Sequence, residues 1–214
     1  MKVELENVLP ADIEKKSFEI IEQELGGRIL DKDKVQIIKR VIHTSADFEY
    51  VDSLTFSENV VEHALAAIKR GACIVTDTEM GKAGINKKVL AKYGGEVLCF
   101  MADEEIARTA KMNGTTRATA SIDKAALLEK EVIFAIGNAP TALVRLYELI
   151  TENKIKPALV IGVPVGFVNV VQSKELIISS GIPYIVARGR KGGSNVAAAI
   201  CNALLYMADE TRGE

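Results

Sequence analysis

Three side chains that could together move a proton are spaced for one face of a helix between residues 38 and 47. Arg40, His43 and Asp47 lie three and four positions apart, and residues at these intervals stack along a helix. They would combine a fixed cation, an imidazole, which is the side chain best suited to proton transfer near neutral pH, and a carboxylate that could orient it. The set suits proton transfer to a ligand with several negative charges. The plain alternative is a surface or hydrogen-bonded core histidine.

A second polar cluster, at residues 188–195, has the composition of an anion site. Its sequence is Arg-Gly-Arg-Lys-Gly-Gly-Ser-Asn. Glycines let a backbone approach a ligand closely, and Ser194 is in position to cap a long Ala-rich helix whose amides and dipole favour a negative group. The spacing matches neither the phosphate-binding loop nor the dinucleotide fingerprint. Carboxylates therefore fit as well as phosphates, and a solvated basic loop is the alternative.

Arg117 is a third candidate for anion binding. Thr115 or Thr116 is in position to cap the helix that follows, which puts Arg117 in the first turn. A cation is poorly placed there with respect to the helix dipole. A ligand carboxylate would explain the arginine, and a solvated side chain is again the alternative.

Alternating strand and helix patterns position these residues. Short apolar runs predict strands at 72–76, 97–100, 132–136, 158–163 and 184–187. Helices are expected near 86–93, 103–112, 120–129, 139–153, 169–180 and 194–208, with three earlier ones at 10–25, 33–46 and 57–70, the last capped by Ser57. Such alternation is typical of a parallel sheet covered on both faces. We therefore predict a three-layer α/β/α fold with a mainly parallel central sheet, preceded by an N-terminal cap of two helices, as one domain over residues 1–214.

The loops that follow the strands are unusual for a fold of this class. Ligands of such sheets bind beyond the carboxyl ends of the strands. Four loops at that edge, 76–85, 137–141, 163–169 and 188–195, are rich in Gly, Asn, Thr and Pro. This exceeds what turns require, so we expect their free backbone amides to face a ligand.

The bulk composition excludes several classes of protein. The chain has 214 residues, 26% of them charged, with a formal net charge of −2 and no tryptophan, which leaves no electrostatic footprint for nucleic acid. The uncharged stretch of residues 157–171 is too short to cross a membrane, and residues 1–7 lack the apolar core of a signal peptide. We therefore expect a cytoplasmic protein. Three isolated cysteines, in apolar runs, indicate neither zinc nor disulfides.

Several ordered motifs resemble those of the precorrin-8 methylmutases of cobalamin (vitamin B12) biosynthesis, in both the metal-free and the cobalt-dependent branches. The similarity runs from about Asp12 to Leu205. It is carried by residues 13–18 (IEKKSF), 40–47 (RVIHTSAD), 77–80 (DTEM) with Gly84-Ile85, Thr116-Arg117, 137–143 (GNAPTAL), 162–168 (GVPVGFV) and 187–194 (ARGRKGGS).

The resemblance implies an isomerase that moves a methyl group from carbon 11 to carbon 12 of one corrinoid macrocycle, a formal 1,5-sigmatropic shift that yields hydrogenobyrinate or cobyrinate. It implies no external cofactor and no resident metal, since any cobalt belongs to the substrate. It also implies a homodimer that holds the tetrapyrrole near the subunit interface, with transient hand-over to neighbouring pathway enzymes. The family's acid–base histidine falls on His43, and its substrate contacts fall on Ser17, Arg40 and Arg117.

The loops supply the remaining substrate-binding candidates. These are Asp77, Thr78, Met80, Gly84, Thr116, Asn138, Ala139, Pro164, Gly166, Phe167, Arg188, Gly192, Gly193 and Ser194. Our hypothesis is that His43 protonates or hydrogen-bonds a pyrrole-type nitrogen beside the migrating methyl, while Arg40 and Arg117 clamp carboxylates of the macrocycle. Two alternatives are a non-catalytic corrinoid carrier and a phosphate- or nucleotide-binding α/β enzyme.

Overall fold

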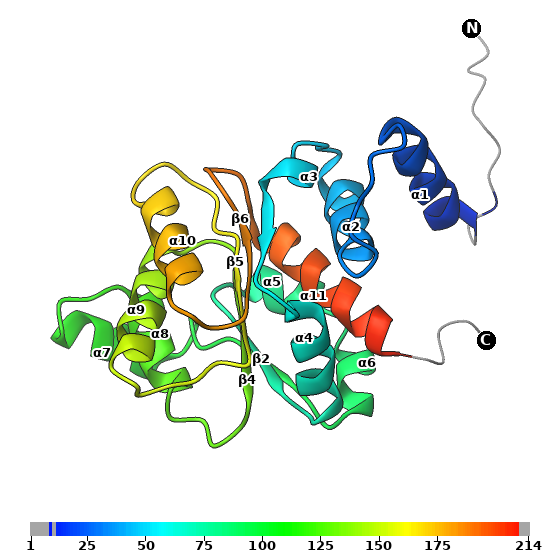
Figure 1. Ribbon diagram of the computed structural model, residues 1–214. Helices are drawn as coiled ribbons and strands as arrows, with labels where there is room; N and C mark the ends of the chain where they lie inside the picture. Colours follow the sequence, from blue (N-terminus) through cyan, green and yellow to red (C-terminus); the bar gives the residue numbers. More distant parts are fainter. Residues whose placement is uncertain (1–8, 10–11, 210–214) are drawn as a thin grey trace, which may run out of the picture.

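Six strands form one sheet in the computed structural model, which describes residue 9 and residues 12–209 (Figure 1). The order across the sheet is β1-β6-β5-β4-β2-β3, with β1 antiparallel to β6 and every other pair parallel. The strands are β1 (Leu54–Phe56), β2 (Cys73–Thr76), β3 (Val97–Leu98), β4 (Val132–Ile136), β5 (Leu159–Gly162) and β6 (Tyr184–Ala187). The mainly parallel sheet predicted from the sequence is confirmed.

The central strands are apolar on both sides because helices cover both faces of the sheet. Every residue of β2, β4 and β5 is buried. Successive side chains of a strand point to opposite faces, so Ile133 joins one hydrophobic core while its neighbour Phe134 joins the other. These continuous apolar runs are the reason that the sequence identified the strands.

The helices form two layers, one on each side of the sheet (Figure 1). One layer consists of α7 (Glu104–Met112), α8 (Arg117–Ala125), α9 (Pro140–Thr151) and α10 (Val170–Ser179). The other consists of α4 (Val60–Lys69), α5 (Glu79–Gly84), α6 (Lys87–Lys92) and α11 (Ser194–Ala208). The cap, α1 (Ile13–Glu24), α2 (Val35–Ser45) and α3 (Tyr50–Ser53), lies outside this second layer, with α2 packed on α11 and α1 outermost.

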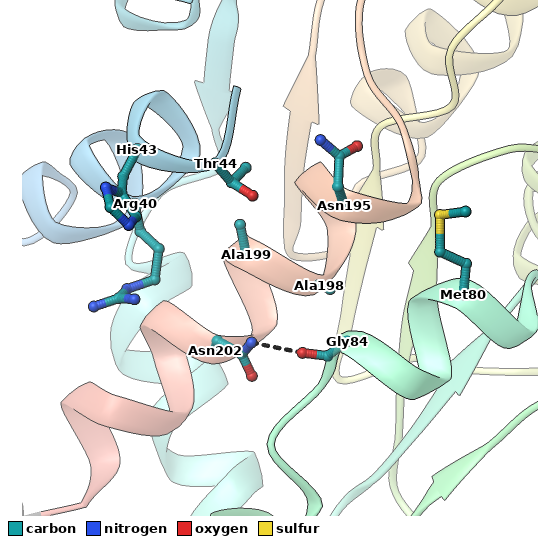
Figure 2. Close-up of a pocket in the computed structure, with 9 residues that line it drawn as sticks. All are labelled: Arg40, His43, Thr44, Met80, Gly84, Asn195, Ala198, Ala199 and Asn202. Atoms are coloured by element: carbon teal, nitrogen blue, oxygen red, sulfur yellow. Dashed lines mark hydrogen bonds between the residues drawn. The ribbon is translucent and has the colours of Figure 1, made fainter. Parts of the chain in front are cut away.

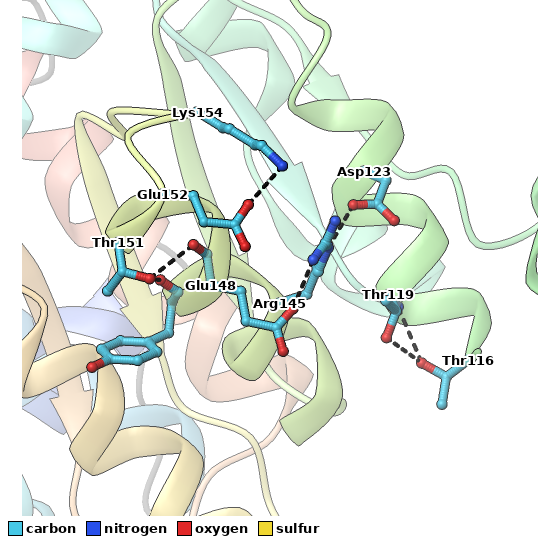
Figure 3. A network of polar contacts seen from close by, with 9 residues as sticks. Thr116, Thr119, Asp123, Arg145, Glu148, Thr151, Glu152 and Lys154 are labelled. Atoms are coloured by element: carbon cyan, nitrogen blue, oxygen red, sulfur yellow. Dashed lines mark hydrogen bonds and ion pairs between the residues drawn. The ribbon is translucent and has the colours of Figure 1, made fainter. Parts of the chain in front are cut away.

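Polar contacts join neighbouring helices of the first layer. Arg145 of α9 donates to Asp123 of α8 at 2.6 Å and to Glu148, one turn along its own helix, at 2.7 Å (Figure 3). Thr116 accepts from the backbone N–H of Thr119 at 3.1 Å and so caps α8, as predicted. Helix α8 therefore begins at Arg117, as the cap predicted, and not near residue 120, where the apolar pattern alone placed its start.

The structure corrects the prediction at four elements. Strand β1 lies where no strand was expected, and α3 adds a third helix to the predicted two-helix cap. The helix expected from Ser57 begins at Val60, because the Ser57 hydroxyl accepts from the backbone of Tyr184 at 2.9 Å and so joins the end of β6. Helix α5 was not anticipated at all. The expected helix start at Pro10 and the tail beyond residue 209 lie outside the described residues.

No helix among the described residues is long and apolar enough to cross a bilayer. The three cysteines are a separate point. Cys73, Cys99 and Cys201 are buried and unpaired, as expected for small apolar side chains. Burial raises the pKa of the Cys201 thiol to about 12, so this cysteine stays protonated and unreactive.

Candidate active site

A cavity of about 260 Å³ opens between α2, α5 and α11, and His43 lies in its wall (Figure 2). Helix α2 contributes Arg40, His43 and Thr44 at helical spacing, since its opposite face, with Ile37, Ile38, Val41 and Ile42, is buried in the core. The amphipathic pattern of α2 therefore places Arg40 and His43, both predicted functional residues, in the wall of the same cavity. Met80 and Gly84 of α5, also predicted, complete the opposite side.

The imidazole of His43 is exposed and supported by an aromatic ring. Its centroid lies 5.4 Å from that of Phe18 on α1, with the two planes tilted by 30°. Within the described part of the chain, neither ring nitrogen has a hydrogen bond to another side chain or to the backbone. Both nitrogens can therefore meet a ligand.

Arg40 is held on three sides. It forms an ion pair with Glu14 of α1 at 2.5 Å, and its guanidinium carbon lies 5.1 Å from the ring of Phe18 and 4.8 Å from that of Tyr206. Cations over aromatic faces are attracted by the ring quadrupole. The side chain is only 19% exposed, so its charge is fixed in place at the edge of the cavity.

Asp47 does not share the helical face of Arg40 and His43 that the spacing predicted. Helix α2 ends at Ser45, and Ala46 takes a left-handed conformation with φ of 53°, so Asp47 leaves the helical face. Its carboxylate accepts from Lys191 Nζ at 2.6 Å, and Lys191 also pairs with Glu49 at 2.6 Å. The hydrogen bond from Lys191 lowers the pKa of Asp47. Asp47 therefore ties the end of α2 to the loop that precedes α11.

The third wall of the cavity, on α11, was missed by the sequence analysis. It consists of Asn195, Ala198, Ala199 and Asn202. Asn202 is committed to the backbone: its Oδ1 accepts from Asn86 N and its Nδ2 donates to Gly84 O, each at 2.8 Å (Figure 2). The available signal was the recurrence of polar and small residues at intervals of three and four in an otherwise apolar helix.

Asp77 occupies the point where neighbouring loops diverge. Strands β3 and β4 lie on opposite sides of β2, and α5 and α9 leave for opposite faces, which is where such sheets commonly bind ligands. The buried Asp77 carboxylate accepts from the N–H groups of Gly137, Asn138 and Ala139 at 2.9, 2.8 and 2.6 Å. Burial raises the pKa of Asp77, and the three N–H bonds act against that rise.

These bonds correct the expectation of free amides at the loop edge. The amides of residues 137–139 are taken by Asp77, and Gly193 N donates to Val163 O at 2.9 Å. A Cβ at Gly192 would lie 2.1 Å from Val163 O, so the close packing of these two loops requires a glycine there. Ser194 is the first residue of α11, not its cap, and its hydroxyl lies 2.7 Å from that of Thr78.

The other predicted residues lie outside the wall of the His43 cavity, as far as the described residues define it. The Ser17 hydroxyl donates to Ile13 O at 2.9 Å. Thr116 lies 3.0 Å from the hydroxyl of Thr141 on α9, and Arg117 is exposed in the first turn of α8. Phe167 is 82% exposed, and the guanidinium carbon of Arg190 lies 5.5 Å from the centroid of its ring. Arg188 forms an ion pair with Glu175 at 3.5 Å. Pro164 is buried and Gly166 N donates to Arg190 O at 3.1 Å.

Metal ligands do not gather anywhere in the described ranges, where no three His, Cys, Asp or Glu side chains are placed to hold one ion. The polar side chains in the cavity wall are those of Arg40, His43, Thr44, Asn195 and Asn202.

Comparison with known proteins identifies this arrangement. The family model described as precorrin-8X methylmutase matches residues 12–207. The chain belongs to the precorrin-8X methylmutase family. It is accordingly an isomerase of cobalamin biosynthesis, a methylmutase, as the sequence motifs indicated.

Individual relatives agree over almost their whole length. The cobalt-precorrin-8 methylmutase of Salmonella typhimurium is 47% identical over 207 residues, covering 94% of this chain and 97% of the relative. That of Priestia megaterium is 45% identical over 202 residues, covering 94% and 90%. A solved structure of precorrin-8x methyl mutase from Thermus thermophilus superposes with a TM-score of 0.83 at 40% identity, covering 92% and 97%.

Proposed function

We propose that this methylmutase acts on cobalt-precorrin-8, converting it to cobyrinate by moving one methyl group from carbon 11 to carbon 12, with His43 as the acid. The observation that carries the proposal is the exposed imidazole of His43 in the same cavity wall as the fixed charge of Arg40. The cobalt form of the substrate is favoured by the names of the relatives at 45% and 47% identity. Metal analysis of the bound macrocycle tests that part.

The imidazole would act on a ring nitrogen next to the migrating methyl. A proton or strong hydrogen bond at that nitrogen withdraws electron density from the macrocycle as the new conjugation forms. The rearrangement adds and removes no atoms, so a proton lent to the ring returns to His43 by the end of the cycle, and the proposal needs no external cofactor. A positioned acid contributes roughly 10²–10⁴-fold to a rate.

The size of the cavity supports the predicted homodimer. Ligand sites commonly enclose about 300–1,000 Å³, and the His43 cavity, at about 260 Å³, would take only one edge of a corrinoid. The rest of the ring would extend beyond this cavity, along α11 and past its open rim. Exposed apolar side chains such as Met80, Phe167 and Val168 are 69%, 82% and 78% exposed, and a second copy of the chain could cover them together with the ligand.

Two further proposals concern the setting of the enzyme. Unpaired cysteines are usual in a reducing compartment, and Cys73, Cys99 and Cys201 are unpaired, which favours the cytoplasm. Hand-over of the product to neighbouring enzymes of the pathway stays a prediction.

The test is single-turnover methyl migration in His43→Ala, with corrinoid binding measured separately by its absorption spectrum. We expect the rate to fall by about 10²–10⁴-fold while binding is retained. His63→Ala is the matched control, because His63 is also exposed but lies on α4, away from the cavity. Migration at the wild-type rate in His43→Ala would exclude the acid role.

A further inference from the structure

A second cavity continues the first along α11. It has a volume of about 460 Å³ and is lined by Glu14, Gln36, Arg40, Tyr206 and Asp209, among others. Arg40 is in the wall of both cavities. From Asn195 to Asp209 the groove follows α11 for about 20 Å, at roughly 1.5 Å per residue. A macrocycle with long acidic side chains could extend over both.

Arg40, at the junction of the two cavities, is already paired with a carboxylate of the chain itself. The Glu14 carboxylate lies 2.5 Å from a guanidinium nitrogen, and the Glu14 side chain is 44% exposed. Its helix, α1, is the outermost element of the cap (Figure 1). The guanidinium is confined by Phe18 and Tyr206, so Arg40 has little freedom to leave this place for a ligand.

A substrate carboxylate that reaches Arg40 must therefore compete with Glu14. Charge-assisted pairs of guanidinium and carboxylate are among the stronger hydrogen bonds, and two carboxylates beside one cation repel each other. When the ligand departs, Glu14 restores the pair, so that Arg40 is never left half-buried and unpaired. The exchange weakens binding of the product by the free energy of the Glu14–Arg40 pair.

We propose that Glu14 is a displaceable competitor for a carboxylate of the macrocycle at Arg40, and that it sets the rate at which product leaves. The inference rests on the proposed function, since it takes the ligand to be a carboxylate-bearing corrinoid. Glu14 is a residue that acts through Arg40 and takes no part in the methyl migration itself.

The experiment compares Glu14→Gln with Glu22→Gln. Glu22 of α1 also makes an ion pair with α2, to Lys39 at 3.1 Å, and lines neither cavity. Both variants therefore lose one ion pair from the same helix pair, but only Glu14→Gln releases Arg40. Thermal unfolding checks that both fold.

We expect Glu14→Gln to bind cobyrinate about five-fold more tightly and to release it about five-fold more slowly, the change that corresponds to an ion pair worth about 1 kcal/mol. The slowing of release should exceed any change in the single-turnover rate of migration, which is measured in parallel. If the peripheral carboxylates of cobyrinate are converted to amides, most of the difference in affinity between Glu14→Gln and the wild type should disappear.

Unchanged affinity and release in Glu14→Gln, or an equal gain in Glu22→Gln, would overturn the role of Glu14 while leaving the proposed function intact. Failure of the wild type to bind cobyrinate would overturn the proposed function, and this inference with it.

Discussion

Phe18 and His43 stack across two helices of the cap, with their ring centroids 5.4 Å apart and their planes tilted by 30°. The same phenyl ring lies 5.1 Å from the guanidinium carbon of Arg40. One side chain of α1 therefore supports both the imidazole and the cation of the candidate active site. Such aromatic contacts contribute about 0.5–1.5 kcal/mol beyond area burial.

Replacement of Phe18 by Leu should slow single-turnover migration by about three- to ten-fold, because this energy would no longer favour one orientation of His43. Phe56→Leu is the matched control: its ring is also partly buried and lies under a cation, Lys34, at 5.7 Å, but it does not line the cavity. Equal slowing of both variants would show that the effect is general destabilisation.

Asp77 offers a test of whether a predicted substrate contact is structural. Asp77→Asn replaces one acceptor oxygen by a donor, which leaves at least one of the N–H groups of Gly137, Asn138 and Ala139 without its present partner. An unsatisfied buried group costs about 1–3 kcal/mol. We expect chemical denaturation to report a loss of that size, with the corrinoid dissociation constant changed by less than about two-fold.

Asp123→Asn provides the comparison, since its ion pair with Arg145 is partly solvated (Figure 3) and should be worth about 1 kcal/mol or less. If the corrinoid dissociation constant of Asp77→Asn rises sharply while the free energy of unfolding is unchanged, Asp77 is a substrate contact and not a structural residue.

The sequence predicts those parts of the fold that depend on local pattern. The strands β2 and β4–β6 are continuous apolar runs, and α2 has a regular stripe, so their existence and the facing of Arg40 and His43 follow from periodicity. Helix α5 escaped because Gly81 and Gly84 are poor helix formers. It forms because Thr78 accepts from Gly81 N at 3.0 Å and because Gly84 packs on Ala198 of α11.

The parts that could not be predicted depend on contacts between distant residues. Strand β1 has three residues and pairs only with β6 at the sheet edge, which gives no periodic signal. The amides after β4 are consumed by a carboxylate 60 residues earlier in the chain. Likewise, Asp47 pairs with Lys191, which lies 144 residues away in the sequence. The spacing of Arg40, His43 and Asp47 could not predict this pair.

Lys174 gives a prediction for alkaline pH. Its buried ammonium donates to Gly189 O and Lys191 O, each at 2.8 Å. Burial lowers its pKa from 10.5 to about 8. Between these values the unfolded chain holds more protons than the folded one, so the free energy of unfolding rises with pH across this window. Below it both states are protonated and the cost of burial is fully present.

The measurement is the free energy of unfolding of the wild type minus that of Lys174→Met, which cancels groups common to both. We expect this difference to rise from pH 8 to pH 10.5. An NMR titration of Nζ should give a midpoint near 8. A flat difference, or a midpoint near the ordinary value, would show that the two carbonyl groups compensate the ammonium for its lost water.

Asn195 and Asn202, on the wall of α11 that the sequence analysis missed, should separate binding from stability. Asn202 bonds the backbone of Gly84 and Asn86, whereas the exposed Asn195 amide makes no hydrogen bond within the described residues. Asn202→Ala should therefore lower the free energy of unfolding by about 1–3 kcal/mol, because two backbone groups lose a partner.

Asn195→Ala should leave the free energy of unfolding within about 0.5 kcal/mol of the wild type. It should weaken corrinoid binding by about three- to ten-fold, which corresponds to the loss of one hydrogen bond. Thermal unfolding and a corrinoid titration on both variants give the comparison, and unchanged affinity in Asn195→Ala would mean that the macrocycle does not reach the start of α11.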